Sequence, residues 1–285
     1  MLTRLTEQEY EQYAPWAYDL AMTAEHSSYP TYRDGIKTRE DFMQRAQRAF
    51  TDETEEVLLY LHEGKVRGWI QWYTIPEECY AGTVSFLVED HAQEAVAEFA
   101  AHVAQRMPGA TLDIGMSADN RQAACALEDC GFTLLEASVN HTMFLSGHTL
   151  PAVPEAVTLV TTADEAEFRN LHDDPTMYWN ADRILADAGH WRSYLYWHAG
   201  RAVGVLCCML DDGWPEIFGI EFENDAFRPE AYCALMAACL RDAQADGCPH
   251  MTYFEEEEQA LPLLAELGFT QVGRYLAYRK ELKEE

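Results

Sequence analysis

The chain has 285 residues, of which 48% are hydrophobic and 24% are charged, and its formal net charge is −29. This composition is typical of a globular protein, and the length suggests two domains of ordinary size. Nucleic-acid phosphates are bound by clustered Lys and Arg, so the charge argues against a nucleic-acid partner. The acidic side chains serve either solubility alone or the attraction of a cationic substrate.

Compartment and redox state follow from what the sequence lacks. No run of about 18 apolar residues occurs, so we expect no membrane association, and the stretch after Met1 lacks the apolar core of a signal peptide. We therefore expect a cytoplasmic protein. The eight cysteines form no Cys-x-x-Cys pair and mostly stand in apolar runs, which favours small buried hydrophobes in a reducing compartment. A zinc site or a disulfide framework is the alternative.

Two patterns recur in the two halves of the chain. A Tyr, a His and two Gly residues at positions 60, 62, 64 and 68 return 136 positions later, at 196, 198, 200 and 204. A Gly-Phe-Thr triplet at 131–133 returns 137 positions later, at 268–270. Two matches at nearly the same spacing indicate a duplicated domain. We place the first repeat at 1–146, a linker rich in Pro and Gly at 147–155, and the second repeat at 156–285.

In the first repeat, capping signals at Thr6 and Thr38 predict two helices separated by a polar, aromatic loop. Apolar periodicity and turn residues then predict the following elements in order: a hairpin of 57–61 and 66–73, a strand at 83–88, a helix at 92–106, a strand at 110–114, a short helix at 120–129, and one or two closing strands within 134–145.

The second repeat follows the same order. The predicted elements are a strand at 157–160, a helix whose cap begins at Thr162, a hairpin spanning 194–210, a strand at 216–222, a helix at 229–245, a strand at 250–254, a helix at 259–266 and a closing strand at 272–279. Strands interleaved with helices predict an α/β (α+β) fold, in which a mixed sheet is flanked by helices.

This order of elements resembles the GNAT superfamily of acyl-CoA-dependent N-acetyltransferases. The most specific part is the short helix of the first repeat, which carries Asn120, Ala123, Leu127, Gly131 and Phe132 at the spacing typical of the family. The second repeat has Glu, Ala, Leu, Gly and Phe at 257, 260, 264, 268 and 269. The resemblance implies two tandem GNAT-like domains, each with a mostly antiparallel mixed sheet, and acetyl-CoA as a co-substrate.

The resemblance also implies a coenzyme loop of the form Gln/Arg-x-x-Gly-x-Gly/Ala before the long helix, where backbone N–H groups bind the pyrophosphate. In the first repeat Gln93 fits, but Val96 and Glu98 stand where small residues are expected. A carboxylate there repels phosphate, so we expect the first repeat to be degenerate.

The second repeat is nearer to the family's loop, with Arg228 followed by Ala231 and Cys233. The resemblance implies coenzyme contacts from these residues, from neighbouring Tyr232, and from the backbone around Phe222. The resemblance also implies a coenzyme contact from Asn120 of the first repeat, because this residue matches the family's Asn. The alternative is an ordinary helix start whose small residues face the core.

Catalytic residues are less clearly marked. The Tyr that often acts as general acid in the family is replaced by Leu127 and Leu264. Glu221 and Glu223 stand at alternate positions near the end of a predicted strand and are the candidate bases. A solvated strand end is the alternative for both.

Other candidates lie outside these motifs. Tyr29, Tyr32 and Arg33, and in the second repeat Tyr178 and Trp179, occupy regions that form the acceptor pocket in this fold. Ordinary aromatic packing is the alternative. The repeated residues His62 and His198 each precede a hairpin Gly, so we expect structural roles for them and no metal site.

These observations predict an N-acetyltransferase that moves an acetyl group from acetyl-CoA to an amine of a small molecule or peptide, with its active site in the second repeat. The alternative is a catalytically inactive binding or sensor protein with the same fold. The sequence leaves a monomer and a homodimer equally open.

Overall fold

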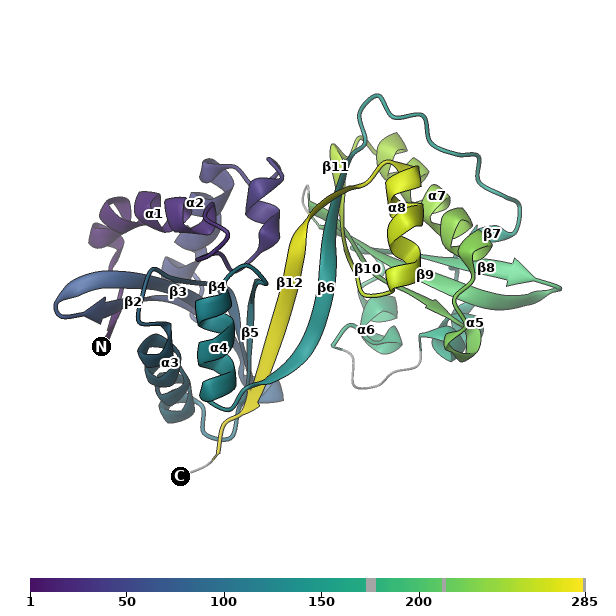
Figure 1. The fold of residues 1–285 in the computed structure, drawn as a ribbon. Coiled ribbons are helices and arrows are strands. Elements are labelled where there is room, and N and C mark those ends of the chain that lie inside the picture. Colours follow the sequence, from purple (N-terminus) through teal and green to yellow (C-terminus); the bar gives the residue numbers. More distant parts are fainter. Residues whose placement is uncertain (173–177, 212–213, 284–285) are drawn as a thin grey trace. The chain divides into compact units, whose positions relative to one another are not determined.

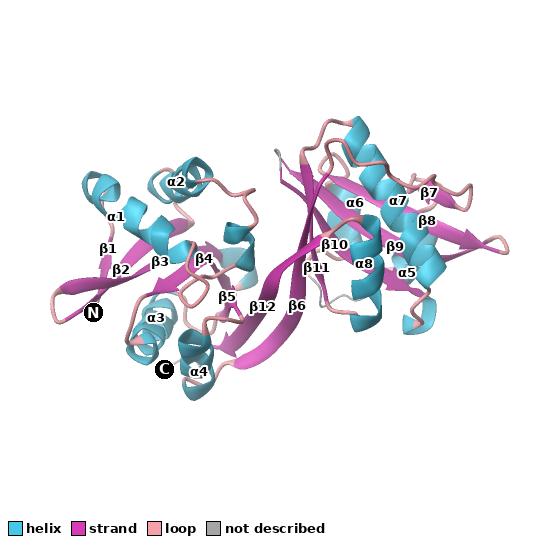
Figure 2. Ribbon diagram, turned by 45° about the horizontal axis from the view of Figure 1, so that its top comes forward, coloured by secondary structure: helices cyan, strands magenta, loops and turns pink. Residues whose placement is uncertain are grey.

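The structure is a computed structural model that describes residues 1–172, 178–211 and 214–283. Contacts between residues divide it into unit 1, made of Met1–Val139 and Val272–Glu285, and unit 2, made of Asn140–Gln271. Within each unit the strands form a sheet with helices on both faces (Figure 1, Figure 2). This architecture confirms the predicted mixed α/β class.

Unit 1 contains six strands in the order β1-β2-β3-β4-β5-β12. Only β4 and β5 pair in parallel, and the other pairs described are antiparallel. The strands are β1 (Leu2–Arg4), β2 (Glu55–His62), β3 (Lys65–Ile75), β4 (Tyr80–Val88), β5 (Thr111–Ser117) and β12 (Thr270–Glu281). The helices are α1 (Glu7–Ala21), α2 (Arg39–Gln47), α3 (Ala92–Arg106) and α4 (Arg121–Asp129).

Helices cover the two faces of the unit 1 sheet in pairs (Figure 1). One apolar cluster joins α3 and α4 to the sheet through side chains such as Phe99 and Leu127. A second cluster joins α1 and α2 to the opposite face through side chains such as Phe42 and Trp69. Alternate residues of the central strands serve the two clusters, as the pleat of a strand requires.

Unit 2 repeats this plan with the strand order β6-β11-β10-β9-β8-β7. Its strands are the end of β6 (Thr133–Phe144), β7 (Val157–Leu159), β8 (Trp191–His198), β9 (Arg201–Asp211), β10 (Trp214–Phe222) and β11 (His250–Glu255). Helices α7 (Pro229–Ala245) and α8 (Leu261–Leu267) pack on one face. Helices α5 (Glu165–Leu171) and α6 (Ala181–Ala186) pack on the other.

The last strand of each sheet does not follow the predicted boundaries of the repeats. Strand β12, at the end of the second repeat, pairs with β5 from Tyr275 opposite Ser117 to Glu281 opposite Thr111. In unit 2 the neighbour of β11 is β6, which ends the first repeat, and the Leu145 N–H donates to the Pro249 carbonyl at 2.9 Å. Each sheet is therefore closed by a strand from the other repeat, so neither predicted repeat contains its own last strand.

Most predicted elements are confirmed, including α3 and α7 at the predicted bounds and the capping boxes at Thr6 and Thr38. The cap predicted at Thr162 is wrong: Asp164 is the N-cap, and its carboxylate accepts a hydrogen bond from the Thr161 hydroxyl. The segment after Gly131 forms one closing strand, β6. Strand β1 and helix α6 were not predicted, because both are too short to show a period.

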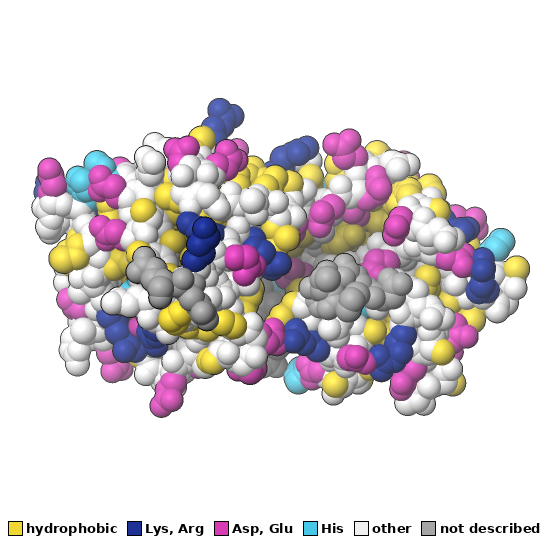
Figure 3. Space-filling model, turned by 90° about the horizontal axis from the view of Figure 1, so that it is seen from below, with side chains coloured by type: hydrophobic (Ala, Val, Ile, Leu, Met, Phe, Trp, Pro, Cys, Tyr) yellow, Lys and Arg dark blue, Asp and Glu magenta, His cyan; other side chains and the backbone are white. Residues whose placement is uncertain are grey.

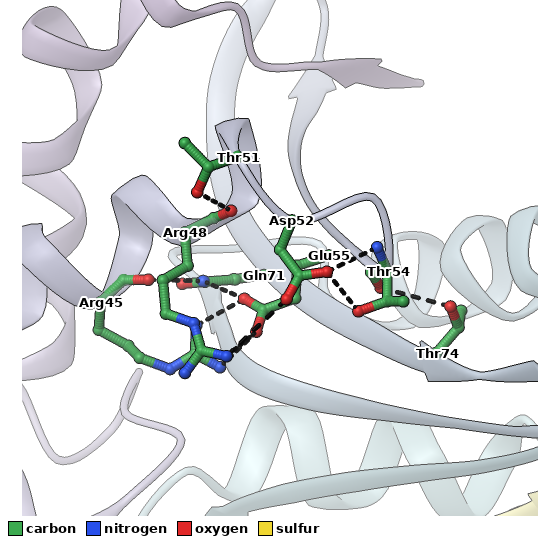
Figure 4. A network of polar contacts seen from close by, with 8 residues as sticks. All are labelled: Arg45, Arg48, Thr51, Asp52, Thr54, Glu55, Gln71 and Thr74. Atoms are coloured by element: carbon green, nitrogen blue, oxygen red, sulfur yellow. Dashed lines mark hydrogen bonds and ion pairs between the residues drawn. The ribbon is translucent and has the colours of Figure 1, made fainter. Parts of the chain in front are cut away.

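Strand β2 carries two consecutive buried carboxylates, which fix helices on opposite faces of the sheet. Glu55 pairs with Arg45 of α2 through two contacts of 2.5 and 2.9 Å, and Gln71 of β3 donates to the same carboxylate (Figure 4). Arg48 and Asp52 extend this network toward solvent. Paired charges and hydrogen bonds of this kind offset the cost of burying a carboxylate.

Glu56 points to the other face and fixes α3. Its carboxylate contacts Arg106 at 2.7 Å and His102 at 3.0 Å, and the indole of Trp72 donates to it. Burial alone raises the pKa of Glu56, but the hydrogen bonds from His102 and Arg106 outweigh this effect and hold the pKa at about 2.

Charged side chains of both signs are interspersed on one face, and the cysteines are unpaired. On the face seen in Figure 3, carboxylates are scattered singly, with basic side chains between them. The cysteines are all free, and Cys207, Cys208 and Cys239 are buried. None of the helices in the described part of the chain combines the length and the apolar character that a membrane crossing needs.

Candidate functional site

In unit 2, strands β10 and β11 separate soon after they meet. Their parallel pairing joins Glu216 to Thr252 and Ile217 to Tyr253, whereas β10 continues to Phe222. The pairing of β10 with β9 shifts in register between Ile217 and Gly219, which marks a β-bulge at Phe218. A bulge bends a strand and changes where the following side chains point. Nothing in the sequence signals this bulge.

The bulge places Glu221 on the face covered by α5 and α6. Cys207 lies on the same face, in the apolar cluster formed with α5 and α6. Burial and, to a smaller extent, the nearby Glu221 carboxylate raise the pKa of its thiol. One carboxylate oxygen of Glu221 lies 2.7 Å from Nδ1 of His172, a buried residue at the end of α5. No motif links these two residues, which are 49 positions apart.

His172 is held at both ring nitrogens. Its Nε2 is 2.6 Å from the carbonyl oxygen of Trp179, which only accepts, so Nε2 is the donor of this bond. Its Nδ1 contacts Glu221 and fixes the orientation of that carboxylate, whose side chain keeps 29% of its surface exposed.

Aromatic side chains line the same region. The rings of Tyr178, Trp179, Trp191 and Phe218 follow one another with centroid separations of 5.0, 5.1 and 5.1 Å. Tyr178 and Phe218 at the two ends are exposed, and the guanidinium of Arg183 lies over the Tyr178 ring. Thus Tyr178 and Trp179, predicted as acceptor-pocket residues, lie on the same face as Glu221.

The second candidate base has a different environment. Glu223 follows the end of β10 in a short 3-10 turn, Glu223–Asp225, and pairs with Arg201 at 2.7 Å. Its carboxylate is therefore already neutralised by a cation of the hairpin. Glu221, which contacts His172, is the better placed base.

The predicted coenzyme residues lie around the start of α7. Arg228 is the N-cap residue, and it makes no side-chain cap to the first turn. Its Nε is buried and has no hydrogen-bond partner among the described residues. Ala231 is fully buried and Cys233 half-buried, with a pKa raised mainly by burial.

Two of the predicted coenzyme contacts have structural partners. The Tyr232 hydroxyl donates to Glu255 of β11 at 2.7 Å inside the core, and burial raises the pKa of that carboxyl. Phe222 packs edge-on against Phe227 at 5.8 Å. Asn120 caps α4 through a bond from the Ala123 N–H, so its position is explained by the helix alone.

Unit 1 has a corresponding separation of strands, which its own chain fills. Parallel pairing of β4 and β5 ends at Gly82 and Asp113. Beyond that point the Ser28 hydroxyl accepts from the Phe86 N–H, the Ser27 carbonyl accepts from the Ser117 N–H, and His26 donates to the Val88 carbonyl. Both serines are buried. The loop between α1 and α2 thus occupies the backbone groups that the separation exposes.

The other predicted pocket residues of the first repeat pack within unit 1. Tyr29 stacks on Tyr275 of β12 with centroids 5.2 Å apart, and Tyr32 is buried against Phe42. Arg33 pairs with an exposed Asp of the β5–α4 loop at 3.3 Å. Within unit 1, aromatic packing accounts for these side chains.

No family model matches the chain, and no curated protein matches it. Solved structures match at low identity. A GCN5-related N-acetyltransferase from Sphaerobacter thermophilus aligns with a TM-score of 0.66 at 13% identity, over 99% of this chain and 96% of that chain. A tandem GNAT protein from the clavulanic acid biosynthesis pathway gives 0.57 at 14%, over 99% and 98%.

A third structure, a GCN5-related N-acetyltransferase from Kribbella flavida, gives a TM-score of 0.54 at 16% identity, over 76% of this chain and 88% of that chain. Identities this low carry information on the fold and not on activity. The chain has the fold of the GCN5-related N-acetyltransferases, in tandem and over its full length.

Proposed function

We propose that unit 2 transfers an acetyl group from acetyl-CoA to an amine of a small molecule or peptide. The observation that carries this proposal is the Glu221–His172 pair, at 2.7 Å, on the strand that separates from its parallel neighbour. A partly exposed carboxylate held by a buried His is a plausible proton acceptor for an amine nucleophile.

The start of α7 supports coenzyme binding in the same unit. The first N–H groups of a helix lack intrahelical partners and attract phosphate, and this helix has 17 residues and no side-chain cap. Arg228 adds a cation at that end, with an Nε free of partners in the described structure. The small side chain of Ala231 leaves room beside the first turn, whereas Glu230 in the same turn is a carboxylate that repels phosphate.

Unit 1 does not fit the coenzyme, which favours unit 2 as the active one. The backbone groups of β4 and β5 beyond Gly82 are bonded to the unit's own Ser27 and Ser28. By strand register, the position of Glu221 opposite Val205 corresponds to that of Leu87 opposite Trp69. Leu87 is buried and offers no base.

The reaction balances with one base. An acceptor that arrives as an ammonium ion first loses one proton to water. The neutral amine nitrogen then attacks the thioester carbonyl, the bond from carbon to sulfur breaks, and an amide and coenzyme A thiolate form. Glu221 accepts the proton that the nitrogen loses, and His172 keeps the carboxylate in place. The leaving thiolate takes a proton from water, because Leu264 stands at the position of the family's tyrosine and is buried.

The acceptor is expected to be a cationic amine with an apolar part. The net charge of −29 favours cations, and the row of aromatic rings from Tyr178 to Phe218 offers surface for an apolar body. Aryl-alkyl amines and peptides with aromatic N-terminal residues share this chemistry.

Titration calorimetry with acetyl-CoA tests the proposal, followed by thiol release in the presence of polyamines, aryl-alkyl amines, aminoglycosides and peptides. We expect one coenzyme per chain and thiol release with at least one amine class. If acetyl-CoA produces no heat of binding and does not protect the protein against thermal unfolding, the proposal is overturned.

The buried Leu264 favours one second candidate, a sensor that binds the coenzyme without transferring its acetyl group. A leucine cannot donate a proton to a leaving thiolate, and Leu127 stands at the same position in the first repeat. A sensor would give the calorimetric signal but release no thiol with any amine of the panel.

A further inference from the structure

We propose that unit 1 binds a divalent transition-metal ion of the zinc type through His62, His91 and Glu94. Each of these residues offers one ligand atom, and the three atoms lie within 4.8 Å of one another. His62 ends β2 at the hairpin turn, His91 is the N-cap of α3, and Glu94 is in its first turn. This site is independent of the transferase proposal, because it lies in the other unit.

The donor set matches the chemistry of zinc. Two imidazoles and one carboxylate are the ligands of many zinc sites in which the protein supplies three donors and leaves the fourth position open. Nδ1 of His62 lies 3.0 Å from Oε2 of Glu94, close to the spacing of about 3.3 Å between neighbouring ligands in a tetrahedral site with bonds near 2 Å. Two of the ligand atoms are thus already at a separation that a shared ion requires.

His91 completes the site with a small rotation. Its ring stacks on that of His62 at a centroid distance of 3.6 Å and an angle of 10°. Parallel rings do not direct their lone pairs to one point, so the His91 ring must turn to bind the ion. It is free to do so because 42% of the side chain is exposed.

Asp90 and Tyr60 lie beside these ligands. Nε2 of His91 lies 3.8 Å from Oδ1 of Asp90, and this oxygen is buried with no hydrogen-bond partner in the described part of the chain. Tyr60 donates its hydroxyl proton to Glu94 at 3.0 Å. Ligating His and carboxylate groups usually have such outer partners, which orient them.

A surface cavity of about 380 Å³ adjoins the ligands. Its lining includes His91, Glu94, Gln122, Cys125 and Asp129. Space of this size next to a three-ligand set gives room for water or a small ligand in the open position. The Asp129 carboxylate in this lining adds negative charge that favours a dication, whereas Asp90 is paired with Arg67 at 3.7 Å.

In the second repeat only the first of the three ligands has a counterpart of the same residue type, and this residue, His198, serves as a matched control. His198 occupies the position of His62 in its hairpin, but Arg228 is the N-cap residue there and Ala231 stands in the first turn. An Arg does not ligate metal, and an Ala offers no donor atom. His198 therefore has the residue type and turn of His62 without its partners.

Titration of the metal-free, full-length protein with Co²⁺, followed by displacement with Zn²⁺, tests the site. We expect one Co²⁺ per chain, a visible spectrum of tetrahedral nitrogen and oxygen ligation, and no charge-transfer band from thiolate. His62→Ala, His91→Ala and Glu94→Ala should each weaken binding about 10- to 100-fold, whereas His198→Ala should bind like the wild type.

Folding of the variants is checked independently by thermal unfolding without metal. All three ligands are on the surface, so their melting temperatures should stay near that of the wild type, and Zn²⁺ should raise only those of the wild type and His198→Ala. Absence of binding to the wild type, a thiolate band, or equal losses in His62→Ala and His198→Ala would each overturn the proposal.

Discussion

The long helices of the two units start in the same place in the fold but with different chemistry. Helix α3 begins after His91 and carries Glu94 in its first turn, whereas α7 begins after Arg228 and carries Ala231. One start presents nitrogen and oxygen ligands suited to a cation. The other presents a cation and a small residue, with Glu230 between them, in a turn whose unpaired N–H groups attract an anion.

The central strands differ in the same sense. Leu87 in β4 and Glu221 in β10 occupy equivalent register positions, and the separation of β4 from β5 is filled by Ser27 and Ser28. Unit 1 thus lacks both the base and the open strand edge. The two units therefore share a scaffold but differ in the side chains at equivalent positions, so each can carry a different site.

The largest expected effect concerns the base. Glu221→Gln removes the proton acceptor while keeping the size of the side chain, so kcat/KM for the amine should fall about 10²- to 10⁴-fold. The Kd for acetyl-CoA should remain within about twofold, because the carboxylate faces the acceptor side. Steady-state kinetics and calorimetry on the same samples measure both.

Glu223→Gln separates the two candidate bases. This carboxylate is paired with Arg201, and its loss should reduce kcat/KM far less than the loss of Glu221. Equal losses in the two variants would mean that the end of β10, rather than one carboxylate, matters for activity.

A second prediction uses a reversal of charge between the units. In unit 1, Glu56 of β2 pairs with Arg106 of α3, whereas in unit 2, Arg192 of β8 pairs with Asp246 after α7. The folded-state pKa of Glu56, about 2, is below its unfolded value of 4.5. Its contribution of about 3 kcal/mol is therefore complete above pH 4.5 and is lost as the pH falls toward 2.

Native-state hydrogen exchange measures this effect locally. Glu56→Gln should lower the free energy of opening in α3 by about 3 kcal/mol at neutral pH and remove most of its dependence on acid. Asp246→Asn should instead affect amides of α7. A Glu56→Gln variant with unchanged protection in α3 would contradict the assignment.

A third prediction exchanges the two helix starts. His91→Arg combined with Glu94→Ala gives α3 the residues of α7, so Co²⁺ binding should fall about 100-fold or more. The same variant should still bind one acetyl-CoA per chain, because Ser27 and Ser28 continue to fill the separated strands of unit 1. A second coenzyme site would show that the helix start alone decides binding.

Much of the fold was predictable because its signals are local. A capping box marks the start of α1, and apolar periods fix both ends of α3 and α7. The exchange of β6 and β12 between the units was not predictable. Both strands have the same length and similar patterns, so either satisfies the edge of either sheet.

The candidate site was predictable only in part. Glu221 could be selected because it alternates with apolar residues near the end of a strand, but its partner His172 lies 49 positions away with no motif between them. The bulge at Phe218 depends on pairing with β9 and leaves no trace in composition. His91 and Glu94 stand three positions apart at the start of a helix, a spacing that places two side chains near each other. This pair could have been recognised in the sequence as two potential metal ligands, with His62 as a candidate third.

The smallest expected effect concerns Arg228. Arg228→Ala removes a cation from the start of α7 while the helix end remains, so the Kd for acetyl-CoA should rise about tenfold, equivalent to about 1.4 kcal/mol. The effect should shrink at high salt, because the contact is electrostatic and near the surface. Arg241→Ala, on the same helix, is the matched control, since Arg241 bonds to the carbonyls of Leu150 and Pro151 far along the chain from the helix start. Calorimetry at two salt concentrations should then show a tenfold difference between the two variants at low salt only. If they behave alike, charge at the start of α7 does not distinguish the second repeat from the first, and the contrast between the two helix starts reduces to the metal ligands of unit 1.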